Sequence, residues 1–296
     1  MVRRQGFPSR GSLFAVGTGL RPAPTWKFLF GLLFLFSLTG RVRASEPTEF
    51  RVCLLEDNLP YSSRQNNSGF DLDTAKAVAE ALKQTLVPIW VKNNTHIDEI
   101  EDSDFPTRRL SRNECDALFS VPGPDAVKDS PKLTVGVPYY GAAFELIGRA
   151  GGAPTTLAAL GENPVAVQSQ TIANFVLNAR KAKMRTFFST EEALSGMAKG
   201  ETATALLWGP TAGWYLHNHP ELKLSFVAGY DPPAVVCWNE HVATRKSDQA
   251  LREAIDKALA QLNASGALQP LLEHYGIPFH KPFDTTYSLA EMQKLK

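Results

Sequence analysis

Short apolar runs that alternate with helical patterns constrain the fold of this chain most strongly. Each run is bounded by turn residues and is apolar along most of its length, as expected of strands that are buried on both faces. Between the runs, apolar residues recur at helical spacing. Strands that alternate with helices predict parallel sheets flanked by helices, and therefore an α/β protein. The strand-like runs cover residues 50–55, 86–91, 115–120, 164–168, 184–188, 203–208 and 222–228.

Two of the predicted helices have candidate caps. The first carries its apolar face at Ala75, Val78, Ala79 and Leu82, and the second between Leu251 and Leu262. An oxygen-bearing side chain just before a helix satisfies its first free N–H groups. We therefore expect Asp71 or Asp73 to cap the first helix, and Ser247 or Asp248 to cap the second.

Two stretches interrupt the alternation. Residues 137–147 are extended with no helix after them, and residues 229–234 are rich in Gly and Pro. A unit rich in βαβ patterns lies between them, and the chain then resumes with a strand at 241–244 and two helices. This order predicts two lobes joined by two crossing strands above a cleft. The expected lobes are 45–140 with 233–296, and 141–232.

Residues 1–44 have the features of a secretory signal peptide. A basic leader ends at Lys27, and a run of 13 apolar or small residues follows over 28–40. The run is too short to span a bilayer, which needs about 20 residues. Val42-Arg43-Ala44 supplies residues suited to a cleavage site, so cleavage is expected after Ala44. A buried core helix is the alternative for this run.

The charge distribution argues against nucleic acid as a partner. Seven of the 31 Lys and Arg lie in residues 1–44, which hold no acidic residue. The remaining 24 basic residues stand against 30 acidic ones, so the exported body carries a net charge of −6. Binding to phosphates needs a basic face, which such a body lacks.

The chain has three cysteines, which export would place in an oxidising compartment. Cys53 and Cys115 each lie in a strand-like run, and Cys237 lies beside Trp238. A Cys53–Cys115 disulfide is expected if those two strands are neighbours, and three buried thiols are the alternative. No pair of cysteines has the spacing of a thioredoxin, zinc-ribbon or haem motif.

Several runs resemble the extracellular solute-binding proteins, family 3. The resemblance covers nearly all of residues 50–278. It implies a two-lobed type II periplasmic-binding-protein fold, a periplasmic location and a monomer that binds a small molecule and has no cofactor. The runs that carry it are Ser68-Gly-Phe-Asp-Leu-Asp-Thr-Ala75, residues 115–122, Val137-Pro-Tyr-Tyr140, Pro164–Gln168 with Thr171, and Leu251–Tyr275.

A narrower resemblance points to a subgroup of this family that is associated with quinoprotein alcohol dehydrogenases, such as methanol dehydrogenases. It implies an accessory role, with the dehydrogenase or its cytochrome as partner. Trp208-Gly-Pro-x-Ala-Gly213 is the most specific of the matching runs. The others are Arg51-Val-Cys53, Asn58-Leu-Pro-Tyr61, Cys115-Asp116 and Val121-Pro-Gly123.

The sequence departs from the family at both anchors that an amino-acid ligand needs. The family places an Arg for the ligand carboxylate after the third strand, but residues 121–128 hold only Lys128. Trp208 stands where the family places an Asp for the ligand ammonium. A buried zwitterion without counter-charges would cost several kcal/mol, so ordinary amino acids are not the expected ligands.

The expected cleft is aromatic and polar. Aromatic side chains would enclose a flat or apolar group, and neutral polar groups would supply hydrogen bonds. For Trp208 a core position is the alternative, and for Thr171 a plain helix cap. No third ligand accompanies His217 and His219, so no metal site is expected. The candidate ligand-binding residues are Asn58, Tyr61, Phe70, Pro122, Gly123, Tyr140, Gln168, Ser169, Thr171 and Trp208.

Three functions follow from these observations. The first is a non-catalytic accessory protein of a periplasmic quinoprotein alcohol dehydrogenase. The second is the substrate-binding subunit of an ABC importer, which would dock on a membrane permease. The third is a dehydratase on the same fold, which would need a general acid with a raised pKa, and Glu145 is the candidate.

Overall fold

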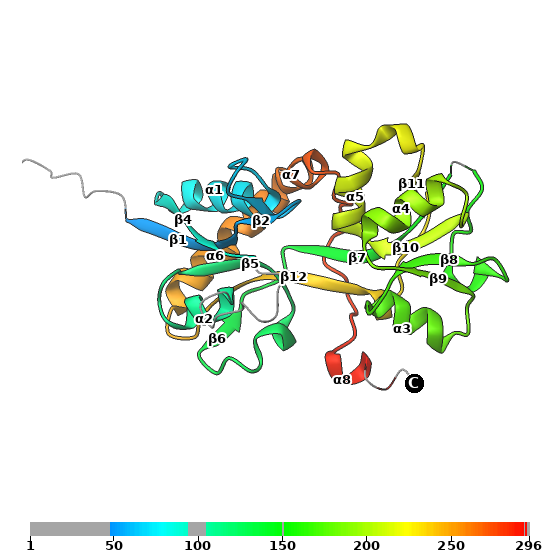
Figure 1. The fold of residues 1–296 in the computed structure, drawn as a ribbon. Coiled ribbons are helices and arrows are strands. Elements are labelled where there is room, and N and C mark those ends of the chain that lie inside the picture. The colour runs from blue at the N-terminus through cyan, green and yellow to red at the C-terminus, as the bar shows by residue number, and fades with distance from the viewer. Residues whose placement is uncertain (1–47, 94–104, 150, 293, 295–296) are drawn as a thin grey trace, which may run out of the picture. The chain divides into compact units, whose positions relative to one another are not determined.

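A computed structural model describes residues 48–93, 105–149, 151–292 and 294 (Figure 1). Residues 46–296 belong to one compact unit. The expected signal peptide and its cleavage after Ala44 lie outside the described residues. Within the described residues, no helix has both the length and the apolar character that a membrane crossing requires.

Ten strands form one sheet in the order β4-β1-β5-β12-β7-β10-β8-β9, with β6 paired to β12 and β11 paired to β7. The neighbours β4-β1-β5 and β10-β8-β9 run parallel, and every antiparallel pair of this sheet involves β12 or β7. The α/β class is thus confirmed. The bounds are β1 Glu49–Leu55, β4 Thr85–Val91, β5 Ala117–Pro122, β6 Leu133–Val135, β7 Tyr140–Gly148, β8 Val165–Gln168, β9 Met184–Phe187, β10 Thr204–Trp208, β11 Ser225–Phe226 and β12 Cys237–Arg245, and a separate hairpin joins β2 Asp57–Asn58 to β3 Ser62–Ser63.

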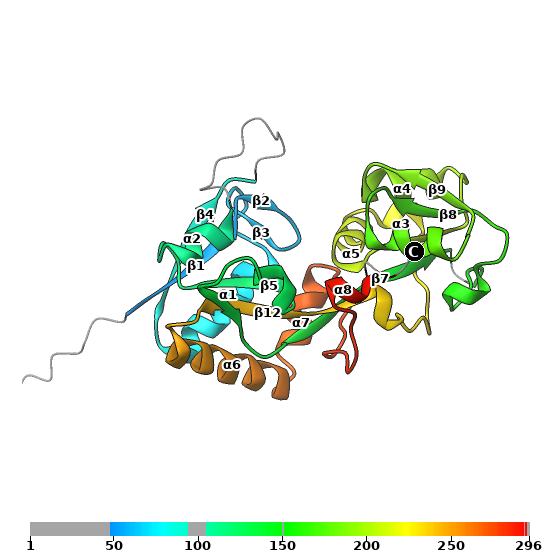
Figure 2. The same ribbon diagram turned by 90° about the horizontal axis from the view of Figure 1, so that it is seen from below.

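Helices cover both faces of the sheet (Figures 1 and 2). They do so because successive side chains of a strand point to opposite faces, and those on both faces are apolar. Val165 and Val167 of β8 pack in the same cluster as α3, whereas Ala166 between them packs with α4 and α5. Around β1, the side chains of Val52 and Leu54 pack with α1, α6 and α7. The bounds are α1 Phe70–Leu82, α2 Pro106–Ser111, α3 Ile172–Ala179, α4 Thr190–Ala198, α5 Gly209–Asn218, α6 Gln249–Ala264, α7 Leu268–His274 and α8 Leu289–Met292.

The two long strands β7 and β12 lie side by side in the middle of the sheet (Figure 1). Each has nine residues, and they pair antiparallel from Cys237 opposite Ala143 to Glu240 opposite Tyr140. These strands contain the extended stretch and the returning strand that the sequence indicates. The division into lobes at 140/141 and 232/233 stays a prediction.

The expected helix caps are wrong. Helix α1 begins after Gly69, whose φ of 130° is a left-handed conformation that glycine tolerates, and no side chain caps the helix. A Cβ on Gly69 would lie 2.4 Å from the Tyr61 carbonyl oxygen, so only glycine fits there. Asp248 does stand at the N-cap of α6, but its carboxylate pairs with Arg245 at 2.5 Å instead of capping the helix.

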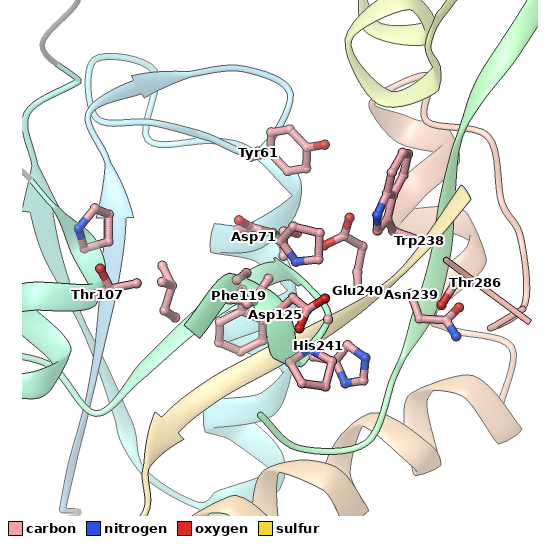
Figure 3. A pocket seen from close by; sticks show the side chains of 18 of the residues that line it. Tyr61, Asp71, Thr107, Phe119, Asp125, Trp238, Asn239, Glu240, His241 and Thr286 are labelled. Atoms are coloured by element: carbon pink, nitrogen blue, oxygen red, sulfur yellow. Dashed lines mark hydrogen bonds between the residues drawn. The ribbon is translucent and has the colours of Figure 1, made fainter. Parts of the chain in front are cut away.

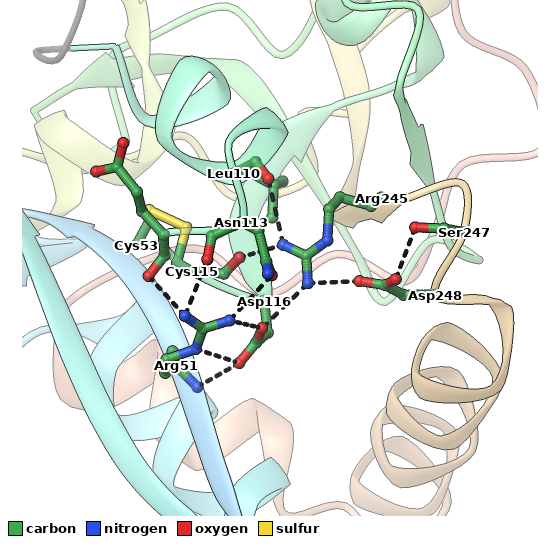
Figure 4. A network of polar contacts seen from close by, with 10 residues as sticks. Arg51, Cys53, Leu110, Asn113, Cys115, Asp116, Arg245, Ser247 and Asp248 are labelled. Atoms are coloured by element: carbon green, nitrogen blue, oxygen red, sulfur yellow. Dashed lines mark hydrogen bonds and ion pairs between the residues drawn. A yellow bond between two sulfur atoms is a disulfide. The ribbon is translucent and has the colours of Figure 1, made fainter.

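Cys53 and Cys115 form a disulfide beside the parallel pair β1-β5 (Figure 4). This settles the choice that the sequence left open, and Cys237 is a buried free thiol. Next to the disulfide, Asp116 accepts hydrogen bonds from Arg51 Nη2 at 2.6 Å and from Arg245 Nη2 at 3.1 Å. Arg245 also donates to the Cys115 carbonyl oxygen. The bridge and the ion-pair cluster therefore tie β1, β12 and the chain just before β5 together.

Candidate functional site

A cavity of about 970 Å³ opens where β1, β5 and β12 meet the first turn of α1 (Figure 3). Its volume is at the upper end of the range typical of small-molecule sites. Segments far apart in the sequence contribute to its wall, including the 58–62 loop, the β5 end and the chain near the C-terminus. Its principal polar and aromatic lining residues are Asn58, Tyr61, Asp71, Phe119, Ser120, Trp208, Trp238, Asn239, Glu240, His241, Tyr287 and Glu291.

Asp71 is a buried carboxylic acid in the cavity wall. It lies in the first turn of α1, where Ser120 Oγ donates a hydrogen bond to its Oδ1 at 2.5 Å. Burial raises the pKa of Asp71 to about 7, although the bond from Ser120 works in the opposite direction. Near neutral pH this carboxyl therefore exchanges between its protonated and ionised forms.

Glu240 is a second buried acid in the same wall. It lies on β12, is 2% exposed, and its Oε2 is buried without a hydrogen-bond partner among the described residues. Burial, followed by the nearby Asp71 carboxylate, raises the pKa of Glu240 to about 8. Figure 3 shows both side chains in the cavity wall, Asp71 from α1 and Glu240 from β12.

Aromatic rings form a second part of the wall. Trp208 Nε1 donates a hydrogen bond to the Tyr61 hydroxyl at 2.9 Å, which joins the end of β10 to the 58–62 loop. The Trp208 and Trp238 ring centres lie 5.8 Å apart at an interplanar angle of 62°. Both rings line the same cavity as the two carboxyl groups, and aromatic surface there can enclose an apolar or cationic group.

The C-terminal segment completes the wall. The Phe283 N–H and carbonyl bond the Asn239 side chain at 2.7 and 2.9 Å, and Gly141 N–H donates to the His280 carbonyl at 2.9 Å. These bonds hold the segment against β7 and β12, and residues 286–288 and Glu291 then reach the cavity (Figure 1, red).

Five of the ten candidate ligand-binding residues line this cavity. They are Asn58, Tyr61, Pro122, Gly123 and Trp208. Asn58 and Tyr61 come from the β2–β3 hairpin and Trp208 from the end of β10, whereas Pro122 ends β5 and Gly123 follows it. Whether they contact a ligand stays a prediction.

The other five are absent from the described lining. Phe70 and Tyr140 are fully buried and pack edge to face with ring centres 5.2 Å apart. The Thr171 hydroxyl caps α3 by accepting from Asn174 N at 3.3 Å, and Gln168 Nε2 donates to the Phe188 carbonyl at 3.2 Å. Ser169, which follows β8, is also absent, and only Ile172 of this region reaches the cavity.

Other residues considered from the sequence also lie away from it. Lys128, the sole candidate anchor for a ligand carboxylate, is exposed and does not line the cavity. Glu145, the candidate general acid, is buried outside the lining, and its Oε1 shares a hydrogen bond with His280 Nε2 at 2.7 Å. Among the described residues, no group of three or more His, Cys, Asp or Glu is placed to hold a metal ion.

Sequence reasoning missed Asp71, Glu240 and Trp238 as site residues. Asp71 lies inside the Gly-Phe-Asp run, where a helix cap explained it sufficiently. Glu240 and Trp238 belong to a strand whose position beside β5 depends on pairing with a partner more than one hundred residues away. An acidic residue two places after a Trp in a strand was the only available signal, since side chains at that spacing share a face.

Several solved structures share the fold. MxaJ from Methlophaga aminisulfidivorans MPT is 21% identical, with a TM-score of 0.58 over 78% of this chain and 99% of that one. The periplasmic binding protein XoxJ from Methylobacterium extorquens AM1 is 21% identical, with a TM-score of 0.55 over 78% and 98%. The unliganded, open L-cystine solute receptor of Neisseria gonorrhoeae is 16% identical, with a TM-score of 0.64 over 78% and 94%.

No curated protein sequence matches the chain. A family profile does match, over residues 50–278, which is most of the chain and includes every strand of the ten-stranded sheet except the first residue of β1. The chain belongs to the bacterial extracellular solute-binding proteins, family 3.

Proposed function

We propose that this protein is an exported binding protein that assists a periplasmic quinoprotein alcohol dehydrogenase and does not itself catalyse a reaction. One observation carries the proposal. The runs that resemble the dehydrogenase-associated subgroup converge on the cavity, although they are far apart in the sequence: Asn58 and Tyr61 from one run, Pro122 and Gly123 from another, and Trp208 from a third. The fold shared with MxaJ and XoxJ agrees with this reading.

The charged residues of the cavity argue against ordinary amino acids as its ligands. An amino-acid carboxylate needs a cationic partner, and the described lining holds neither Lys nor Arg. The protein would therefore use the family fold for a different ligand or for a partner protein. Export through the leader at residues 1–44 would place it in the same compartment as the dehydrogenase.

The test is capture of the dehydrogenase. Tagged protein purified from its own host should retain a quinoprotein alcohol dehydrogenase or its cytochrome, identified by mass spectrometry and by quinone absorbance. Loss of the gene should lower alcohol oxidation by periplasmic extracts, and adding purified protein should restore it. Capture of an ABC permease with undiminished alcohol oxidation would overturn the proposal.

The importer reading remains the second candidate, because the cavity has the size and aromatic lining of a ligand site. It predicts ligand-dependent thermal stabilisation together with stimulation of a permease by the liganded protein. The dehydratase reading is weaker, since Glu145 is bonded to His280 away from the cavity. Turnover of a cyclic carboxylate that is abolished in Glu145→Gln would favour it.

A further inference from the structure

Acidic side chains dominate the charge of the described cavity lining. Among the described lining residues four are acidic, and none is Lys or Arg. The one basic lining residue is His241, and burial lowers its pKa, so it is mainly uncharged near neutral pH. The acidic four are Asp71, Asp125, Glu240 and Glu291.

Glu240 provides an independent sign that something is bound here. Its side chain is almost fully buried, and its Oε2 has no hydrogen-bond partner among the described residues. A buried acceptor without a donor is destabilising and is rare in folded proteins. Since Glu240 lines the cavity, a donor that enters the cavity lies beside this carboxyl group.

None of the described groups that shift the pKa of the two buried acids is a cation. Asp71 accepts one neutral hydrogen bond, from Ser120. The remaining titratable neighbours are the phenols of Tyr61, Tyr139 and Tyr140, and burial raises the pKa of each well above its ordinary value, so they stay neutral. With His241 also mainly neutral, the described lining supplies no cation to pair with the ionised forms of these acids.

The rings beside the acids suit a cation that carries an apolar body. Trp208, Trp238 and Tyr61 are electron-rich, and their faces attract a cation while excluding water from it. An ammonium group carries N–H donors for the carboxylates, whereas its hydrocarbon part would be enclosed by the rings. An anion would meet acidic side chains, and the described lining holds no Lys or Arg to pair with it.

We infer that the cavity binds a protonated amine on an apolar or aromatic body, whose N–H groups donate to Glu240 and Asp71. The inference rests on the proposed use of the cavity as a binding site. It adds amines as the ligand class and predicts that carboxylates and neutral alcohols bind less tightly.

Binding of such a cation has a proton signature. The two carboxyls are partly protonated near neutral pH, and a cation favours their ionised forms. Binding should therefore release protons, and affinity should rise with pH. For one carboxyl that titrates near pH 7, affinity should rise about tenfold between pH 6 and pH 8, and coupling of the two groups would increase this.

Three probes with one aromatic body separate charge from shape. Isothermal titration of the full chain would use 2-phenylethylamine, 2-phenylethanol and phenylacetate at pH 8. The amine should bind at least tenfold more tightly than the alcohol, and phenylacetate should not bind. Repeating the amine titration in buffers of different ionisation enthalpy would count the released protons.

Two variants locate the effect. Glu240→Gln keeps the shape of the side chain and should weaken amine binding at least tenfold, with less than a threefold change for the alcohol. Glu80→Gln removes a carboxylate from an exposed position of α1 and should change neither. Should Glu240→Gln fail to fold, the amine-to-alcohol ratio of the unaltered chain and its proton release still decide the question.

Equal binding of amine and alcohol, or unchanged amine binding by folded Glu240→Gln, would overturn the inference. Capture of the dehydrogenase without amine binding would reject the inference and leave the proposed function standing. Amine binding without capture of the dehydrogenase would support the inference and reject the proposed function.

Discussion

Removal of the Cys53–Cys115 disulfide should cost a large share of the stability of this fold. The two cysteines are 62 positions apart in the sequence, so the bridge closes a long loop. In the chain-entropy description, a bridge over about 60 residues destabilises the unfolded chain by about 4 kcal/mol at 25 °C. The double variant Cys53→Ala with Cys115→Ala should therefore lose about 3–4 kcal/mol. For a domain of this size, the midpoint of thermal unfolding should fall by roughly 10 °C.

Urea unfolding followed by tryptophan fluorescence would measure this loss, with oxidised and reduced forms of the unaltered chain beside the double variant. Cys237→Ala is the matched control, because it removes a buried thiol that is not bridged. It should cost about 1 kcal/mol, the value of a small deletion in a core. Thiol titration of the unfolded, unreduced chain should find one free thiol. Three free thiols, or a double variant within 1 kcal/mol of the unaltered chain, would refute the reasoning.

Three other perturbations test the site and its frame. Burial alone would raise the pKa of Asp116, but hydrogen bonds from its arginine partners outweigh burial and lower it. Asp116→Asn should therefore cost about 1–3 kcal/mol at pH 7. The difference in urea midpoint from the unaltered chain should begin to shrink only as pH falls below about 4 and should vanish below the lowered pKa of the folded state, whereas a constant difference would contradict this. The pKa of Glu240 is about 8 when folded and about 4.3 when unfolded, so ionisation destabilises the fold as pH rises through that window by up to about 1.4 kcal/mol per pH unit. In urea titrations, the stability of Glu240→Gln relative to the unaltered chain should thus increase from pH 5 to pH 8. The same stability difference between the two proteins at pH 5 and at pH 8 would contradict the burial of the Glu240 carboxyl. Deletion of residues 279–296 removes part of the cavity wall and should expose Trp238. Acrylamide should therefore quench tryptophan fluorescence more strongly in the shortened chain. Unchanged quenching would show that the segment does not cover the cavity.

Much of the fold is predictable from the sequence, because hydrophobic periodicity reports local burial. The alternating runs predict the α/β class, and the runs at Cys53 and Cys115 become the neighbouring strands that the disulfide requires. Details that depend on one hydrogen bond were predicted less well. Asp71 has a side chain suited to a helix cap, but the close approach of Gly69 to the Tyr61 backbone sets the start of α1 instead.

Local sequence patterns account for the alternation of strands and helices, the family, and a set of polar and aromatic residues, of which Tyr61 and Trp208 meet at the cavity. That Asp71 and Glu240 share this cavity follows from the tertiary structure alone. They meet because β12, near the end of the chain, inserts between β5 and β7. Local periodicity records which side chains are buried, whereas the shared low-dielectric environment that raises both pKa values arises from long-range strand pairing.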